Sequence, residues 1–414
     1  MKKIILNGPL LSQSGYGKQA RFALDALLSQ PDKFDVYVAT TNWGKTSWIT
    51  TKDVYYNKIH KLLEKTQRYV SSSGASFDIH VQVGIPNEIK KLAPVNILYT
   101  AGTETNIVSH SWLNMINQID RVITVSNHST LGFTNSAYEI RENNKATGLI
   151  KAEVPVEHVS YPVPGFHFKN DAEFPNLELE NFTFLAVSQW GPRKNLDATI
   201  AWFVEEFRND DVTLLLKVST MNHSVPDFYT TKKRMENIKK SFGEVKCKIK
   251  FVHGDCTDNE FDKLYQVKNV NCFINIAHGE GFGLPIFEAA YNGVPVVTHG
   301  WSGPSDFLYM GSEEKFARVP MYLNQIQPEA VWADILIKDS AWAFVNKEDY
   351  QKTIRKVYDN YEEYKTKAIE LQDYLYKNFT EEKMYNKFCD LVSGETTVNE
   401  KDIEKWLEDM TEYE

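Results

Sequence analysis

Two glutamates, Glu280 and Glu288, stand eight residues apart around a turn that is rich in glycine. Their carboxylates accept hydrogen bonds and are suited to binding hydroxyl groups from both sides of the turn. Gly281 and Gly283 lie between them and let the backbone come close to a bound ligand. This spacing of residues predicts a binding site for a molecule that carries several hydroxyl groups.

The elements around this turn explain how it would be held. The apolar run 272–277 before it predicts a buried strand, residues 287–291 predict a helix, and residues 294–297 predict the next strand. The turn therefore lies where a strand ends and a helix begins. At such a point the first backbone N–H groups of the helix lack internal partners and the helix dipole is positive, so that an anion is favoured there.

The sequence EGFGLPIFEA (280–289) followed by NGVPVV (292–297) resembles the E-x7-E signature of retaining, nucleotide-sugar-dependent glycosyltransferases of family 4. The resemblance implies an α/β protein with the GT-B fold, in which two Rossmann-like, doubly wound parallel-sheet domains face a central cleft. It implies that Glu280 binds the hydroxyls of the transferred sugar and Glu288 those of the ribose. The donor-binding residues that it implies between these two are Gly281, Phe282, Gly283 and Leu284.

A basic pair, Arg193 and Lys194, follows the apolar run 182–188. In the family a basic pair at this place neutralises the diphosphate of the donor, often as an Arg five residues before a Lys. This chain has Gln189 at the Arg position, and the adjacent Arg193 is expected to substitute for it. Fixed cations would stabilise a departing nucleoside diphosphate without a metal ion. The alternative is a solvated basic pair at the start of a helix.

Another glycine-rich loop, with Gly15 and Gly17, follows the first predicted strand and opens a helix. A Walker A loop is excluded because Ser12 stands at the first glycine position and Gln19 follows Lys18. A dinucleotide fingerprint fits poorly because the loop is too long and the second strand does not end in an acidic residue. The third interpretation, the first loop of GT-B enzymes beside the donor diphosphate and the acceptor, fits best.

The resemblance extends to two further segments. Residues 251–265 resemble the segment that holds the nucleobase, so that Val252, His253 and Gly254 are expected to border the base. Residues 98–129 resemble the strand, acid-Thr pair and helix of the first domain, where Glu104 would accept the acceptor's proton or bind a sugar hydroxyl. An N-cap or salt-bridge role for Glu104 is the alternative.

Composition restricts the class of protein. The chain has 414 residues, 42% hydrophobic and 24% charged, which is typical of a globular protein with two domains. No stretch reaches the ~20 apolar residues of a membrane span. The four cysteines and ten histidines show no spacing typical of metal ligands, so no protein-bound metal is expected and the protein is predicted to be cytoplasmic.

Apolar runs alternate with helical patterns, which predicts parallel sheets with crossover helices. Five strands are predicted in each half, and a segment rich in Pro and Asn lies between the halves. The prediction is an acceptor-binding domain (1–163), a linker (164–181), a nucleotide-sugar-binding domain (182–378), and a last segment (379–414). That last segment would hold a helix returning to the first domain and an acidic tail.

Charge is uneven along the chain. The whole chain has a net charge of −9, whereas residues 1–170 have 18 basic against 13 acidic residues, a net charge of +5. This asymmetry favours an anionic partner at the first half, although ordinary surface variation explains it equally well.

The prediction is a retaining glycosyltransferase that uses a UDP- or GDP-sugar as co-substrate and needs no further cofactor. The acceptor would be a glycan, a lipid phosphate or a modified nucleic acid. One alternative is a non-catalytic sugar-nucleotide-binding protein. The other is a dinucleotide-dependent oxidoreductase, which is disfavoured because the second predicted strand does not end in an acidic residue.

Overall fold

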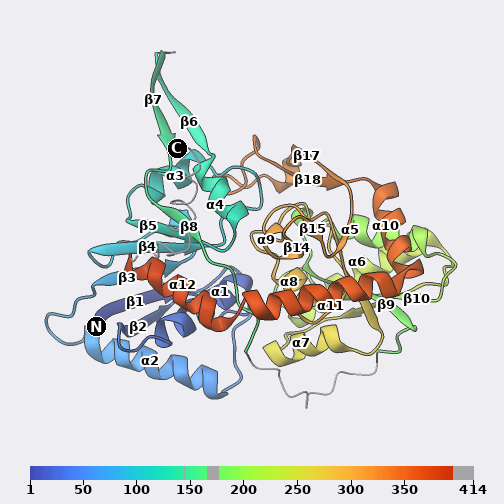
Figure 1. Cartoon of the computed structure of the whole chain (residues 1–414), viewed down its shortest axis with the longest axis horizontal. Helices are drawn as coiled ribbons and strands as arrows, with labels where there is room; N and C mark the ends of the chain where they lie inside the picture. Colours follow the sequence, from blue (N-terminus) through green and yellow to red (C-terminus); the bar gives the residue numbers. More distant parts are fainter. Residues whose placement is uncertain (144, 166–176, 395–414) are drawn as a thin grey trace, which may run out of the picture.

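Two six-stranded sheets organise the computed structural model, which describes residues 1–143, 145–165 and 177–394 (Figure 1). We call the part built on the first sheet the first domain and the part built on the second sheet the second domain. The strands of the first sheet are β1 (Lys2–Gly8), β2 (Phe34–Thr40), β3 (Ile79–Val83), β4 (Val95–Thr100), β5 (Arg121–Thr124) and β8 (Val156–His158). Those of the second are β9 (Phe182–Gln189), β10 (Val212–Ser219), β11 (Lys248–Val252), β12 (Val270–Ile274), β13 (Val296–Thr298) and β16 (Ala317–Arg318).

Both sheets are parallel and doubly wound. The order is β2-β1-β3-β4-β5-β8 in the first sheet and β11-β10-β9-β12-β13-β16 in the second, and every pair of neighbours is parallel. The successive residues Leu214, Leu215 and Leu216 are all fully buried, as expected of a parallel strand with helices on both faces. The prediction of two Rossmann-like sheets is therefore confirmed.

Helices cover the two faces of each sheet. Several begin at polar N-caps, for example Ser14 before α1 and the capping box of Thr257 and Glu260 at α7. The helices of the first domain are α1 (Gly15–Leu28), α2 (Val54–Val70), α3 (His110–Ile116) and α4 (Asn127–Thr134). Those of the second domain are α5 (Leu196–Glu206), α6 (Val225–Phe242), α7 (Asp258–Gln266), α8 (Leu284–Tyr291), α9 (Ser305–Leu308), α10 (Lys347–Asp359) and α11 (Tyr361–Asn378).

The last described helix, α12 (Glu381–Ser393), follows α11 and packs on α1 of the first domain (Figure 1). The rings of Phe22 and Phe388 lie 5.6 Å apart, and the Cys389 thiol is 3.1 Å from the carbonyl oxygen of Ala26. Residues 166–176 of the predicted linker and residues 395–414 of the predicted acidic tail lie outside the described residues. Among the described helices, none has the length and apolar character needed to cross a membrane.

Several short elements were not predicted. The hairpin of β6 (Ala137–Glu142) and β7 (Lys145–Lys151) projects from the first domain (Figure 1). The strands β14 (Tyr309–Met310) and β15 (Glu313–Glu314) form a small antiparallel pair, and β17 (Met321–Gln325) and β18 (Ala341–Val345) form another. Short 3₁₀ turns occur at η1 (Pro86–Glu88), η2 (Pro192–Lys194) and η3 (Pro328–Ala330).

The carboxyl ends of the two sheets face each other at the domain interface. Ser47, after β2, donates to the carbonyl oxygen of Asn222, after β10. Ser126, after β5, donates to the carbonyl oxygen of Gly281, after β12. Loops that follow the strands of both sheets therefore meet, and they are the loops that contain most of the predicted site residues.

Candidate active site

The predicted site residues of the second domain come from two neighbouring strands. Arg193 and Lys194 lie in the 3₁₀ turn after β9, and Glu280 lies in the loop after β12. These strands are paired in the sheet, and the strand order reverses between them, with β10 and β11 on one side and β13 and β16 on the other. Ligands of open α/β sheets bind outside the carboxyl ends of strands at such a reversal.

An ion network joins four of the predicted residues. The Glu280 carboxylate lies 2.5 Å from the Lys194 ammonium and 3.0 Å from the Arg193 guanidinium. Arg193 also donates to the carbonyl oxygen of Gly279 at 2.7 Å and reaches Glu104 of the first domain at 3.3 Å. The salt-bridge alternative for Glu104 is therefore realised in this structure, and it bridges the two domains.

Burial and charge together set the protonation of this network. Burial alone would raise the pKa of Glu280, but Lys194 and Arg193 lower it to about 2. Burial and the neighbouring Arg193 lower the pKa of Lys194, while Glu280 acts in the opposite direction. Burial tends to lower the pKa of Arg193, and Glu104 and Glu280 outweigh it. Two cations are thus held beside a carboxylate that stays ionised at neutral pH.

Glu288 lies apart from this network and has its own two partners. It sits on α8 with 7% of its surface exposed. One carboxylate oxygen accepts a hydrogen bond from the buried Tyr265 hydroxyl at 2.9 Å, and the other lies 2.5 Å from the ammonium of Lys18. Lys18 belongs to the first domain, one residue after Gly17. Neither partner was predicted, because 270 residues of chain separate Lys18 from Glu288.

The glycines of the turn differ in what surrounds them. Gly283 precedes α8 with φ +91°, in the left-handed region that favours glycine. A Cβ on Gly281 would lie 2.6 Å from the carbonyl oxygen of Ala101, and one on Gly279 would lie 2.0 Å from that of Glu104. At Gly279 and Gly281 the close neighbour is therefore the backbone of the first domain.

The remaining predicted donor residues lie around the turn in different settings. Phe282 is 4% exposed, and its ring packs against the rings of Tyr161 and Phe307. Leu284 is partly buried against the same core. A Cβ on Gly17 would lie 1.9 Å from the carbonyl oxygen of Ser12, whereas one on Gly15 would meet only Leu284, at 3.9 Å.

The segment predicted to border the nucleobase lies at the end of β11. The structure does not bring it into the ion network of Glu280. Val252 ends the strand, the His253 imidazole lies 3.3 Å from the Asp227 carboxylate, and Gly254 accepts a hydrogen bond from Lys217 through its carbonyl oxygen. His223 completes a group of side chains with the composition of a metal site. Asp227 and His223 were not predicted.

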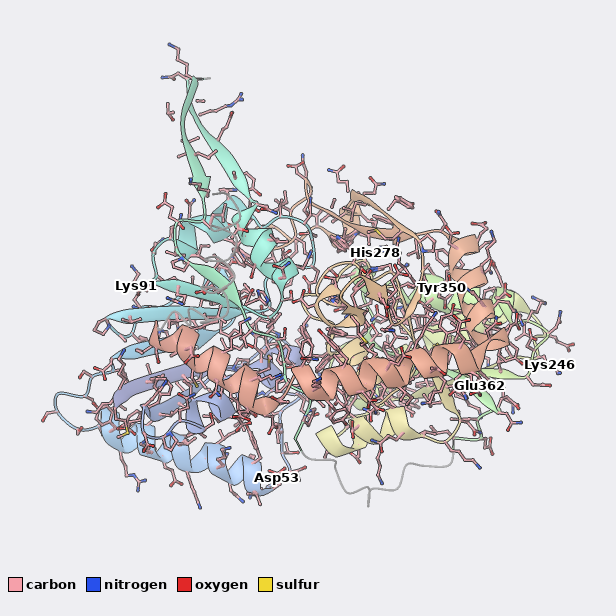
Figure 2. All side chains as sticks on the ribbon, in the orientation of Figure 1. Asp53, Lys91, Lys246, His278, Tyr350 and Glu362 are labelled. Carbon is pink, nitrogen blue, oxygen red and sulfur yellow. The ribbon has the colours of Figure 1, made fainter. Side chains whose placement is uncertain are left out.

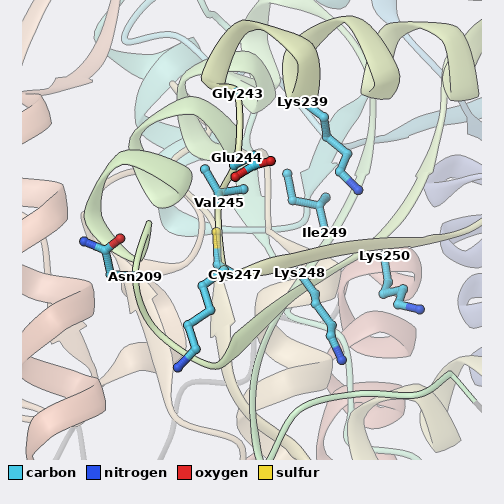
Figure 3. Close-up of a pocket in the computed structure, with 10 residues that line it drawn as sticks. Asn209, Lys239, Gly243, Glu244, Val245, Cys247, Lys248, Ile249 and Lys250 are labelled. Carbon is cyan, nitrogen blue, oxygen red and sulfur yellow. The ribbon is translucent and has the colours of Figure 1, made fainter.

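A groove of about 870 Å³ lies elsewhere, along the end of α6 and the start of β11 (Figure 3). Lys246, at its rim, lies at the edge of the second domain far from the first (Figure 2). Lys246 and Lys248 each pair with an acidic side chain at 2.5 Å, to Asp211 and Glu180 respectively. The groove contains no predicted site residue, and its paired lysines do not make it an anion site.

The sequence of the chain matches the model of one known protein family. The model of the family described as "Family 4 Glycosyltransferase in conflict systems" matches residues 155–388, more than half of the chain. No curated protein matches the chain.

The fold is similar to solved structures over nearly the whole chain. Sucrose-phosphate synthase from Thermosynechococcus elongatus is 12% identical, with a TM-score of 0.63 over 95% of this chain and 99% of that one. HepE from Anabaena in complex with UDP-glucose is 13% identical, with a TM-score of 0.60 over 95% and 100%. A glycosyltransferase from Rickettsia africae is 15% identical, with a TM-score of 0.56 over 96% and 99%. With the family match and the ion network, these likenesses lead to one conclusion: the chain belongs to the family 4 glycosyltransferases of conflict systems and has the GT-B fold.

Proposed function

We propose that this glycosyltransferase transfers a sugar from a UDP- or GDP-sugar to an acceptor hydroxyl with retention of the anomeric configuration. The observation that carries the proposal is the placement of Arg193 and Lys194 beside Glu280, where the order of the second sheet reverses. A diphosphate needs fixed cations, and a sugar needs hydrogen-bond acceptors. The complex of HepE with UDP-glucose supports the choice of donor class.

Each charged residue has a role in this proposal. Arg193 and Lys194 bind the diphosphate and stabilise the negative charge that builds on it as the sugar leaves. Glu280 accepts hydrogen bonds from the hydroxyls of the transferred sugar, and Glu288 accepts them from the ribose. Both cations also pair with Glu280, which holds them at the place where the diphosphate would bind.

The acceptor oxygen forms the new bond to the anomeric carbon on the face from which the diphosphate leaves. The bond between that carbon and the phosphate oxygen breaks, and the leaving diphosphate takes the acceptor's proton. No separate base and no metal ion are required in this scheme. Glu104, which contacts Arg193 from the first domain, would bind the acceptor hydroxyl or a sugar hydroxyl.

Contacts between the domains support a reaction in a site that excludes water. Besides Lys18 with Glu288 and Glu104 with Arg193, the backbone N–H of Asn127 donates to Asp306 at 2.8 Å. Removing water strengthens the electrostatic interactions inside the site and prevents hydrolysis of the donor.

The test is an assay of nucleoside diphosphate release with a panel of UDP- and GDP-sugars. Each donor is incubated alone and with a glycan, a phospholipid, and DNA that carries hydroxymethylated bases. Release that depends on one acceptor identifies both substrates, and NMR of the product's anomeric proton then reports the configuration. Tight donor binding without release for any acceptor would favour a non-catalytic binding protein, and an inverted product would refute retention.

A further inference from the structure

A group of three potential metal ligands lies outside the ion network of Glu280. His223 and Asp227 follow β10, and His253 follows β11. One ligand atom of each side chain lies within 4.8 Å of the others. The strands β10 and β11 are neighbours at one edge of the second sheet, whereas Arg193, Lys194 and Glu280 follow β9 and β12.

The burial and spacing of two members suit a metal ion. The side chains of His253 and Asp227 are 5% and 2% exposed, and the imidazole Nε2 lies 3.3 Å from a carboxylate oxygen. Two ligands at the usual zinc distances of about 2.0–2.2 Å lie about 3.3 Å apart in a tetrahedral site. An ion could therefore enter between these atoms with little movement of either side chain.

Hydrogen bonds from the backbone hold the carboxylate in place. Asp227 accepts from the N–H groups of Thr220 at 2.9 Å, Met221 at 3.3 Å and His223 at 2.9 Å. Hydrogen bonds to a ligating carboxylate are typical of metal sites because they fix its orientation. The same loop holds His223 at φ +57°, a left-handed conformation that is uncommon for a residue other than glycine.

The third member lies against the segment after β11. The backbone N–H of Gly254 donates to Nδ1 of His223 at 3.4 Å, and the ring centroids of His223 and His253 lie 5.2 Å apart. Lys217 donates to the carbonyl oxygen of the same glycine.

We propose that His223, Asp227 and His253 bind one divalent transition-metal ion, with Zn²⁺ preferred and one coordination position open. Two imidazoles and a carboxylate are ligands that suit zinc. The ion would tie the loop after β10 to the segment after β11. The cations proposed for the diphosphate follow other strands, and the ion would stabilise this edge of the second domain.

The test uses the full-length protein after dialysis against a chelator. Calorimetric titration with ZnCl₂ should show one equivalent bound per chain, and Zn²⁺ should raise the thermal unfolding midpoint by binding the folded state. His223→Gln and His253→Gln should each lower the affinity at least about tenfold and abolish the rise in the midpoint. His110→Gln, on α3 of the first domain, is the matched control and should behave as the wild type.

Equal Zn²⁺ affinity in the two variants and the wild type would overturn the proposal, since binding would then be elsewhere. Should a variant fail to fold, Co²⁺ titration of the wild-type protein decides the question. A tetrahedral site gives strong visible absorption at one equivalent, and only weak absorption, typical of an octahedral ion, would also overturn the proposal.

Discussion

The ammonium of Lys18 and the carboxylate of Glu288 lie 2.5 Å apart although they belong to different domains. The oxygen that Lys18 contacts is the one that the buried Tyr265 leaves available, since Tyr265 donates to the other oxygen. If Glu288 binds the ribose, the first domain and the nucleotide compete for the same atom. The ion pair of Lys18 with Glu288 would then oppose nucleotide binding.

Lys18→Met should therefore tighten the binding of the bare nucleoside diphosphate. An ion pair between a partly exposed lysine and a buried glutamate is worth about 1 kcal/mol, so the dissociation constant should fall roughly three- to tenfold. Calorimetry measures this change, with the exposed Lys52→Met of the same domain as the control. Weaker binding in the Lys18 variant would mean that Lys18 contacts the nucleotide directly.

The sequence predicted the elements of this fold more completely than the contacts between them. The strands β9 and β12 are mostly apolar because both faces of a parallel sheet are covered, and such runs are visible in a sequence. The strands β8 and β16 are only three and two residues long, too short for a pattern. Tertiary packing brings together Lys18 with Glu288 and His253 with Asp227. The local spacing of residues in the sequence does not predict such contacts.

Lys194→Ala tests the proposed diphosphate site. One charged group that stabilises a leaving group is typically worth ~3–4 kcal/mol, so turnover should fall roughly 100- to 1000-fold. Steady-state rates of nucleoside diphosphate release measure the effect, and circular dichroism checks the fold. Lys250→Ala, on the edge strand β11, is the control and should retain full turnover. A folded Lys194 variant with near wild-type turnover would remove this residue from the mechanism.

Substitutions of Glu280 and Glu288 should affect the binding of different ligands. Glu288→Gln should weaken the binding of the bare nucleoside diphosphate, because the ribose hydroxyls are present in it. Glu280→Gln should leave that binding nearly unchanged and reduce sugar transfer, since a hydrogen bond to a carboxylate is worth ~1.5–3 kcal/mol only for the ligand that carries the hydroxyl. Calorimetry with the diphosphate and with the intact nucleotide sugar compares the two variants. Equal losses for both ligands in the Glu280 variant would show that these roles are misassigned.

Sugar transfer should not depend on a metal ion. The proposed diphosphate ligands are the side chains of Arg193 and Lys194, so turnover should persist in excess EDTA. Chelation should lower the thermal unfolding midpoint if His223, Asp227 and His253 bind zinc. Loss of turnover in EDTA, with recovery on addition of Mg²⁺ or Mn²⁺, would contradict the diphosphate site.

Asp306 should make stability depend on pH. Burial raises its pKa from 3.8 to about 6, although the Asn127 N–H and Lys387 oppose this. The folded state therefore binds more protons than the unfolded state between about pH 4 and pH 6, and the contribution of Asp306 becomes less favourable as pH rises through that range. Relative to the wild type, Asp306→Asn should gain about 1–3 kcal/mol between pH 4 and pH 7. Urea unfolding at several pH values measures this difference, and parallel profiles for the two proteins would refute it.

The glycines at 279 and 281 have a consequence for the mobility of the whole enzyme. Their missing side chains leave room for the carbonyl oxygens of Glu104 and Ala101, so two backbones from different domains lie in direct contact. Even a single methyl group at either position would act as a spacer between the domains. Gly279→Ala and Gly281→Ala would thus push the two domains apart at this contact.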